Sequence, residues 1–304
     1  MSRINDALRR ANLERERTGA PQVPGPATAG GADLAARSLP EAKAAVHPNG
    51  NEASRAAVLL NLFRERCAPT EWAPQPDAAQ FLRRGSAGPG SEELRTLRSR
   101  LDLVREGKPL RKLLITSAIP GEGKSFVAAN LALVMAWRAE SNVLLIDGDL
   151  RSPQLHRSLG APAEPGLCDY LMGNADEFAI VKRGPVENLF FIPGGSEPGS
   201  AGELIANGRL KGLLQRLAVA FDWILIDTPP VVPVADAKLI GELCDGVLMV
   251  VQAGLAPAEV AQRALLEFKS RPFVGVVLNR AEPLPWYGYK YYYGNGKARL
   301  NGKK

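Results

Sequence analysis

The stretch KLLITSAIPGEGKSFVAANL, residues 112–131, combines an apolar run typical of a strand, a glycine-rich turn and the start of a helical pattern. Within it, residues 118–125 (AIPGEGKS) fit the pattern G-x-x-x-x-G-K-[ST], with alanine in place of the first glycine. Backbone N–H groups of such a loop, and of the helix that follows it, face phosphate oxygens. The stretch therefore predicts a site for the phosphates of a nucleotide.

Individual positions of this loop have distinct physical roles. Gly121 and Gly123 let the backbone close around a polyanion without Cβ clashes. Lys124 is expected to reach the β- and γ-phosphate oxygens, and the Ser125 hydroxyl is expected to join the coordination shell of Mg²⁺. We therefore expect ATP and Mg²⁺ as cofactors. The predicted nucleotide contacts in this segment are Pro120, Gly121, Glu122, Gly123, Lys124, Ser125 and Phe126.

Apolar runs alternate with helical patterns on both sides of the loop. The strand-like runs are 112–117, 142–149, 188–193, 222–230, 245–252 and 273–280. Nearly continuous apolar strands joined by helices predict a parallel sheet that is covered on both faces. The predicted fold class is a doubly wound, mostly parallel α/β domain with a P-loop NTPase fold, whose ligands bind at the carboxyl ends of the strands.

Composition divides the chain into three zones. Residues 1–90 are rich in Ala, Pro and Gly and predict a largely disordered N-terminal arm with short helices over 1–17 and 52–66. The helix over 52–66 is expected to be either transient or a docking element for a partner. Residues 91–280 form the predicted P-loop domain, and residues 281–304 form a flexible tail.

Charge and cysteine content exclude several function classes. The net charge of +6, from 38 basic and 32 acidic residues, is modest and spread out, so no nucleic acid partner is expected. Three widely spaced cysteines predict neither a metal knuckle nor a disulfide framework. No apolar run approaches the ~18–20 residues of a membrane span, and the first 20 residues lack a secretory signal. We therefore expect a cytoplasmic location.

Three aspartates lie at the ends of two of the predicted strands. Asp227 closes the run WILID, where a carboxylate could hold Mg²⁺ directly or through water. Asp147 and Asp149 come at the end of VLLIDGD. Two anions so close raise each other's pKa unless a cation intervenes. Mg²⁺ would supply that cation for one of them and leave the other to orient or deprotonate a nucleophile.

The DGDLR segment at 147–151, together with SAIPGEGKS (117–125) and ILIDTPP (224–230), resembles the bacterial tyrosine autokinases of capsule and exopolysaccharide synthesis. The resemblance covers about 91–280 plus the tail. It implies a fold of the deviant-Walker type in which Asp147 and Asp227, with Ser125, serve the metal. Asp149 would then be the base for a tyrosine hydroxyl, and Lys124, Asp147 and Asp149 would form the catalytic set.

Two further features match this family. Glu92, Arg95 and Arg98 have i, i+3, i+6 spacing and lie along one face of a predicted helix. The resemblance implies that they mediate assembly of a homo-oligomeric ring; a solvated helix with local ion pairs is the alternative. Asn279 and Arg280 follow the last predicted strand, where related folds contact adenine.

Five of the six tyrosines of the chain lie within seven consecutive positions near the C-terminus. They are Tyr287, Tyr289, Tyr291, Tyr292 and Tyr293. Beside a kinase-like site, a mobile tyrosine cluster predicts the phosphate acceptor, and each phosphate would add about −1.5 to −2 charge. An aromatic anchor or a base-stacking segment for single-stranded nucleic acid are the alternatives.

Two other functions share parts of this pattern. A partition or septum-site type ATPase has the same fold, but those proteins usually carry lysine where Ile119 stands here. A non-catalytic nucleotide-binding scaffold of a polysaccharide machine is the second alternative. The resemblance to the autokinases further implies a stand-alone cytoplasmic form. Its partners would be a membrane chain-length regulator, which would hold it at the inner membrane, and a cognate tyrosine phosphatase.

Overall fold

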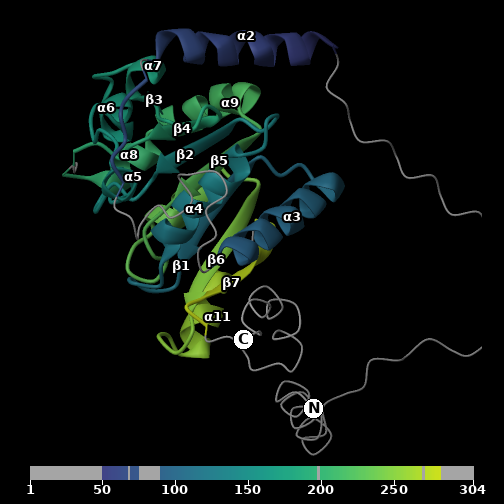
Figure 1. The fold of residues 1–304 in the computed structure, drawn as a ribbon. Coiled ribbons are helices and arrows are strands. Elements are labelled where there is room, and N and C mark those ends of the chain that lie inside the picture. Colours follow the sequence, from purple (N-terminus) through teal and green to yellow (C-terminus); the bar gives the residue numbers. More distant parts are fainter. Residues whose placement is uncertain (1–49, 68, 75–89, 197–198, 269–270, 282–304) are drawn as a thin grey trace, which may run out of the picture. The chain divides into compact units, whose positions relative to one another are not determined.

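The structure, a computed structural model, describes residues 50–67, 69–74, 90–196, 199–268 and 271–281. Within these residues seven strands form one sheet in the order β3-β4-β2-β5-β1-β6-β7 (Figure 1). β3 runs antiparallel to β4, and the other neighbouring strands are parallel. The strands are β1 (Lys112–Ser117), β2 (Val143–Asp147), β3 (Lys182–Arg183), β4 (Leu189–Ile192), β5 (Trp223–Asp227), β6 (Gly246–Gln252) and β7 (Phe273–Asn279).

The six predicted runs coincide with β1, β2, β4, β5, β6 and β7, and the predicted fold class is confirmed. β3 was not predicted, because two basic residues give no apolar pattern. Their pairing with β4 comes from the tertiary structure.

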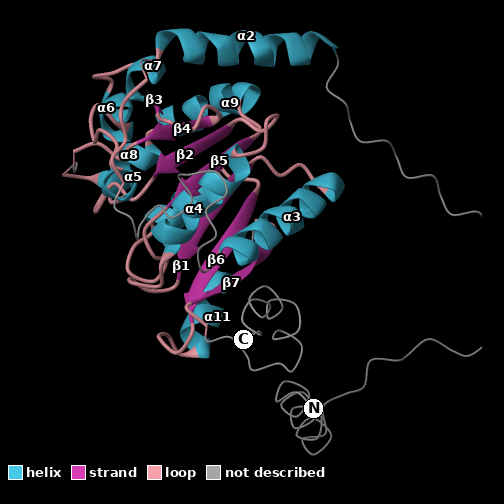
Figure 2. Cartoon of the chain, viewed as in Figure 1, coloured by secondary structure: helices cyan, strands magenta, loops and turns pink. Residues whose placement is uncertain are grey.

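Helices cover both faces of the sheet (Figure 2). Successive residues of β1 point to opposite faces: Leu113 and Ile115 pack with α3 and α4, and Leu114 belongs to the core on the side of α9 and α10. No helix among the described residues has the length and apolar character to cross a membrane. The helices are α2 (Gly50–Arg66), α3 (Ser91–Gly107), α4 (Lys124–Ala136), α5 (Leu155–Leu159), α6 (Leu167–Met172), α7 (Glu177–Ile180), α8 (Ala201–Ala206), α9 (Arg209–Ala220), α10 (Asp236–Gly241) and α11 (Ala258–Leu266).

The patterns of burial explain how α4 and α9 pack on the sheet. Ten consecutive residues of α4, from Val127 to Ala136, are buried, as expected for a helix that lies directly on a sheet and under α3. In α9, Leu210, Leu213, Leu214 and Leu217 are buried at i, i+3, i+4 and i+7, which is the spacing of an amphipathic helix facing the core.

α2 packs on the domain, although residues 52–66 were predicted to form a helix in a largely disordered arm. It lies along α9 (Figure 1). The Phe63 side chain is 1% exposed, and its ring centroid lies 4.9 Å from that of Phe178 and 5.5 Å from that of Phe221. Composition could not predict this docking, because the partners of Phe63 lie more than 100 residues away in the sequence.

The segment after α2 continues the contact. The backbone N–H of Thr70 donates to the carbonyl of Arg183 at 2.8 Å, and Pro69 forms a bridge to the same strand. Trp72 is buried, and its ring meets that of Phe191 edge-on at 6.1 Å. This segment therefore covers the β3 edge of the sheet, which would otherwise present unpaired backbone groups.

We expect Phe63→Ala to destabilise the domain by about 3–5 kcal/mol, because it removes a fully buried aromatic ring and leaves a cavity. Val58→Ala on the same helix is the control, since Val58 is 61% exposed, and should change stability by less than about 0.5 kcal/mol. Urea denaturation of the full chain measures both. Equal, small effects of the two substitutions would mean that α2 does not belong to the folded core.

Candidate active site

The phosphate loop leaves the carboxyl end of β1 and enters α4 at Lys124. Gly121 and Gly123 have φ angles of +87° and +89°, which residues with a side chain rarely adopt. A Cβ atom on Gly123 would also collide with the side-chain amide of Asn279. α4 is 13 residues long, and its first backbone N–H groups open onto the loop. The predicted contact segment, residues 120–126, is therefore built as an anion site.

Glu122 stabilises the conformation of the phosphate loop. Its carboxylate is fully buried and accepts the backbone N–H groups of Ile119 at 2.9 Å and Gln252 at 3.3 Å. Its backbone carbonyl accepts the side-chain amide of Asn279 at 2.9 Å. Because the carboxylate is engaged in this way, Glu122 would contact a nucleotide through its backbone and not through its carboxylate.

Asn279 and Arg280, the predicted adenine contacts, lie beside the phosphate loop at the end of β7. Arg280 has a φ angle of +52°, and its backbone N–H donates to Asn279 Oδ1 at 3.0 Å. Its guanidinium donates to Gln252 Oε1 at 3.0 Å. The structure thus brings both predicted residues to the rim of the loop.

The three predicted carboxylates meet at the same edge of the sheet. Asp147 and Asp227 are paired directly across β2 and β5. The Ser125 hydroxyl donates to Asp227 Oδ2 at 2.5 Å, and Lys124 Nζ lies 3.3 Å from Asp149 Oδ2. The residues predicted to serve catalysis and the metal therefore form one cluster.

Backbone N–H groups hold Asp147 in place. Its Oδ1 accepts the N–H of Asp149 at 3.2 Å, and its Oδ2 accepts the N–H groups of Gln154 and Leu155 at 3.1 and 3.0 Å. Asp149 in turn accepts the N–H of Ser152 at 3.2 Å. The segment after β2 is therefore folded around these two carboxylates.

Burial and mutual repulsion set the protonation of the cluster. Burial, and then the charges of Asp227 and Asp149, raise the pKa of Asp147 to about 8. Burial raises the pKa of Asp227 to about 6, although Lys124 and the Ser125 hydroxyl act in the opposite direction. Burial would lower the pKa of Lys124, but the charges of Asp227 and Asp149 outweigh it, so the pKa is raised. The cluster is therefore short of positive charge.

One oxygen of the cluster is suited to a metal ion. Asp227 Oδ1 is buried and has no hydrogen-bond partner in the structure. No group of three or more His, Cys, Asp or Glu side chains in the described part of the chain could hold a metal by itself. Mg²⁺ in nucleotide sites uses one or two carboxylates together with phosphate oxygens and water. The residues present therefore fit Mg²⁺ that arrives with a nucleotide.

α3 carries the residues that the sequence analysis assigned to ring assembly. Glu92 and Arg95 form an ion pair one turn apart, and both side chains are exposed by 40% or more. Arg98 instead donates to the backbone carbonyl of Val134 in α4 at 3.1 Å. The five tail tyrosines, Tyr287, Tyr289, Tyr291, Tyr292 and Tyr293, lie outside the described residues.

Asp236, the partner of Arg151, is not among the site residues predicted from the sequence. The Arg151 guanidinium donates to both carboxylate oxygens of Asp236, at 2.6 and 3.2 Å. Arg151 belongs to the DGDLR motif, but Asp236 lies 85 residues further on. An acidic residue in the first turn of a helix has a sufficient local explanation, so nothing in the sequence singled it out.

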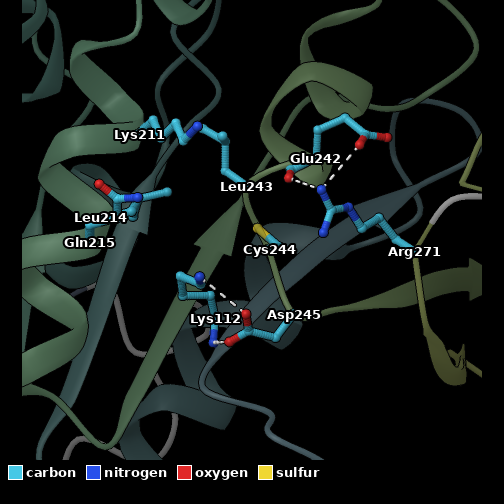
Figure 3. A pocket seen from close by; sticks show the side chains of 9 residues that line it. All are labelled: Lys112, Lys211, Leu214, Gln215, Glu242, Leu243, Cys244, Asp245 and Arg271. Carbon is cyan, nitrogen blue, oxygen red and sulfur yellow. Dashed lines mark hydrogen bonds and ion pairs between the residues drawn. The ribbon is translucent and has the colours of Figure 1, made fainter.

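A cavity of about 170 Å³ lies at the opposite end of the sheet (Figure 3). Lys112, which begins β1, and Asp245, which precedes β6, form an ion pair of 3.1 Å in its wall. Arg271 forms an ion pair with Glu242 in the same wall. Burial raises the pKa of the Cys244 thiol to about 12, so this cysteine is not a nucleophile at neutral pH. The cavity is separate from the phosphate loop.

Sequence comparison identifies relatives of known class. The chain matches no protein-family model. The tyrosine-protein kinase YwqD of Bacillus subtilis is 34% identical over 205 residues, which are 66% of this chain and 86% of YwqD. The tyrosine-protein kinase CpsD of Streptococcus agalactiae is 35% identical over 209 residues, covering 67% of this chain and 90% of CpsD. EpsB of Ralstonia solanacearum matches over 220 residues that are only 29% of its length.

Solved structures share the same fold. The chimerical protein CapA2B2 superimposes with a TM-score of 0.64 at 28% identity, covering 73% of this chain and 99% of that chain. The kinase domain of the Escherichia coli tyrosine kinase ETK superimposes with a TM-score of 0.60 at 26% identity, covering 75% and 97%. The cell division ATPase MinD of Pyrococcus furiosus reaches 0.50 at 26% identity, covering 57% and 74%.

The fold, together with a phosphate loop that lies beside three carboxylates, defines a P-loop protein whose chemistry depends on a nucleotide. Among such proteins, the chain belongs to the bacterial tyrosine-protein kinases. The resemblance noted from the DGDLR, SAIPGEGKS and ILIDTPP segments is thereby confirmed.

The pKa of Asp147 leads to a pH dependence that can be measured. The pKa of Asp147 is about 8 in the folded protein and 3.8 ordinarily. Between pH 3.8 and about pH 8, the folded protein therefore keeps a proton on Asp147 that the unfolded chain has released. The contribution of this group to stability is therefore greatest below its ordinary pKa of 3.8 and is lost as the pH rises toward about 8. We expect the nucleotide-free protein to lose roughly 1 kcal/mol per pH unit from this group between about pH 5.5 and about pH 8.

Asp147→Asn is the matched variant, since its amide cannot ionise. Urea denaturation of both proteins at several pH values should give a flatter dependence for the variant. Parallel curves for the two proteins would show that Asp147 does not titrate in this range.

Proposed function

We propose that the chain is an ATP·Mg-dependent tyrosine autokinase that phosphorylates the tyrosine cluster 287–293 of a neighbouring copy. The observation that carries this proposal is the convergence of Asp147, Asp149 and Asp227 beside Lys124 of the phosphate loop. Asp149 is the least buried of the three carboxylates and can accept a proton once Lys124 turns to the phosphates, which a site that only binds phosphates does not require. The family of the chain supports tyrosine as the acceptor.

The loop and its lysine bind the donor. Residues 120–126 cradle the phosphates through backbone N–H groups, and Lys124 exchanges its contact with Asp149 for phosphate oxygens. Ser125 and Asp227 would hold Mg²⁺ with Asp147, and Mg²⁺, when bound, neutralises charge on the phosphates. Phosphoryl transfer depends mainly on such positioning and electrostatic stabilisation.

Asp149 is the best candidate for the base. Asp147 is fully buried, and both its oxygens accept backbone N–H groups. Asp149 is 7% exposed, and its Oδ2 faces Lys124. Once Lys124 turns to the phosphates, Asp149 Oδ2 is available to accept the proton of a tyrosine hydroxyl. The tyrosine oxygen then bonds to the γ-phosphorus of ATP as the bond from that phosphorus to the β,γ-bridging oxygen breaks and ADP leaves.

Transfer in trans requires a neighbour, and α3 offers the surface for one. Glu92 and Arg95 are exposed and already paired, so they present both charges to an adjoining subunit. Arg98 would act indirectly, by fixing α3 on α4 through the Val134 carbonyl. A homo-oligomeric ring is the assembly we expect.

The biological setting follows from the resemblance to capsule and exopolysaccharide kinases. We infer that the reaction regulates polymerisation and export of such a polysaccharide. A membrane chain-length regulator would activate the chain and hold it at the cytoplasmic face of the inner membrane, and a cognate tyrosine phosphatase would reverse the reaction. The named relatives support neither a partition-type ATPase switch nor a non-catalytic scaffold.

Incubation of the purified full chain with ATP and Mg²⁺ should phosphorylate several of the five tail tyrosines, as mapped by mass spectrometry. Lys124→Met should abolish the signal, because it removes the cation that contacts the β- and γ-phosphates. Lys108→Met, at an exposed lysine after α3, is the matched control and should leave the signal unchanged. An unmodified tail, even with the cytoplasmic segment of a membrane activator added, would refute the kinase proposal.

A mixing experiment separates transfer between copies from transfer within one copy. The donor has all five tail tyrosines replaced by phenylalanine, and the acceptor carries Lys124→Met. We expect phosphate on the acceptor chain, and less of it when Glu92 and Arg95 of both chains are replaced by alanine. Phosphorylation of the unmodified protein without any phosphate on the acceptor would establish transfer within one copy.

A further inference from the structure

Arg151 and Asp236 form a two-pronged ion pair beside the three carboxylates. Arg151 Nε donates to Asp236 Oδ2 at 2.6 Å, and a terminal guanidinium nitrogen donates to Asp236 Oδ1 at 3.2 Å. The Asp236 side chain is 3% exposed, whereas that of Arg151 is 48% exposed. Charge-assisted pairs of this geometry fix the relative orientation of both groups.

The pair joins the two segments that carry the site. Arg151 lies two residues beyond Asp149, on the segment that follows β2. Asp236 is the first residue of α10, at the end of the segment that leaves β5 at Asp227. The ion pair therefore ties the segment that bears Asp149 to the one that continues from Asp227.

The backbone makes a second connection between these segments. The N–H of Gly148 donates to the carbonyl of Asp227 at 2.8 Å. A Cβ atom on Gly148 would lie 2.8 Å from that carbonyl oxygen and 3.2 Å from Ile240 Cδ1 of α10. The two segments thus touch through backbone at Gly148 and through side chains at Arg151 and Asp236.

Stability alone is a poor explanation for this ion pair. A buried carboxylate loses its hydration, and apolar residues of similar volume often serve stability as well or better. The pair instead constrains distance and direction between two segments whose carboxylates must meet the same ligand. Precise placement of such groups governs the rate of transfer, since a displacement of about 1 Å can slow a reaction on the order of 100-fold.

We propose that Arg151 and Asp236 are positioning residues of the phosphoryl-transfer site, whose ion pair sets the position of Asp149 relative to Asp227. This inference rests on the proposed kinase function. The hydrogen bonds of Glu122 and Asn279 hold the phosphate loop in place independently of this pair. Loss of the pair should therefore lower kcat and leave the KM for ATP nearly unchanged.

The test compares Arg151→Gln, Arg151→Lys, Asp236→Asn and the double variant Arg151→Gln/Asp236→Asn. Phosphotyrosine formation at varied ATP concentration should show kcat reduced on the order of 10-fold to 100-fold in the Gln and Asn variants. Arg151→Lys should recover only part of the loss, because an ammonium group cannot form both contacts. The double variant should be no worse than the single ones, as expected for residues that act as a unit.

A second measurement does not depend on turnover. Calorimetric titration of ADP at varied Mg²⁺ should show that the variants need more Mg²⁺ for half-maximal tightening of ADP, while ADP affinity without Mg²⁺ is unchanged. Thermal unfolding of each variant identifies any that does not fold; Arg151→Lys, which keeps the charge beside Asp236, then carries the test.

Lys238→Gln and Glu267→Gln are the matched controls. These residues form an exposed ion pair of 3.1 Å that also involves α10, and its loss should leave kcat within about two-fold. Unchanged kcat and Mg²⁺ requirement in the Arg151 and Asp236 variants would overturn the inference, as would a double variant whose loss is the product of the single losses. Absence of phosphotyrosine in the unmodified protein would instead refute the kinase proposal. The ADP titrations would still test whether the Arg151–Asp236 pair positions the carboxylates.

Discussion

The approach of Asp147, Asp149 and Asp227 at one edge of the sheet is the constraint on which the rest of the site depends. Parallel pairing of β2 and β5 sets Asp147 directly beside Asp227, and the turn through Gly148 returns Asp149 toward Lys124. Three carboxylates in a buried place repel one another, and one lysine does not balance them. Burial is the largest cause of the raised pKa values of Asp147 and Asp227, and the charge of Asp149 raises both further, in line with this imbalance. A divalent cation that arrives with a nucleotide would resolve it.

Much of the surrounding structure fixes these groups in place. Glu122 and Asn279 hold the phosphate loop from one side. On the other side, backbone N–H groups hold Asp147, and the Arg151–Asp236 pair ties together the segments after β2 and β5. A site held in this way needs little rearrangement when the phosphates and the metal bind, which is the condition for efficient electrostatic stabilisation of phosphoryl transfer.

Local patterns predicted the parts of the structure that local chemistry determines. The glycine-rich loop, the apolar strands and the aspartates at their ends each have a short-range signature, and the family resemblance follows from the same segments. The docking of Phe63 against Phe178 and Phe221, and the pairing of Arg151 with Asp236, join residues far apart in the sequence. Glu122 was predicted as a nucleotide contact from its position in the loop, but no local pattern predicted that its carboxylate accepts the N–H groups of Ile119 and Gln252, as a buried anion requires. Tertiary contacts decide such features.

We infer that Mg²⁺ together with a nucleotide completes the carboxylate cluster. Calorimetric titration of ADP into the full chain, with and without Mg²⁺, is the decisive measurement, and Asp227→Asn, which removes the charge of the carboxylate whose Oδ1 lacks a partner in the structure, is measured alongside. We expect Mg²⁺ to tighten ADP binding at least several-fold in the unmodified protein and to have little effect in the variant. Equal ADP affinity with and without Mg²⁺ in the unmodified protein would refute the role of Mg²⁺ at this cluster.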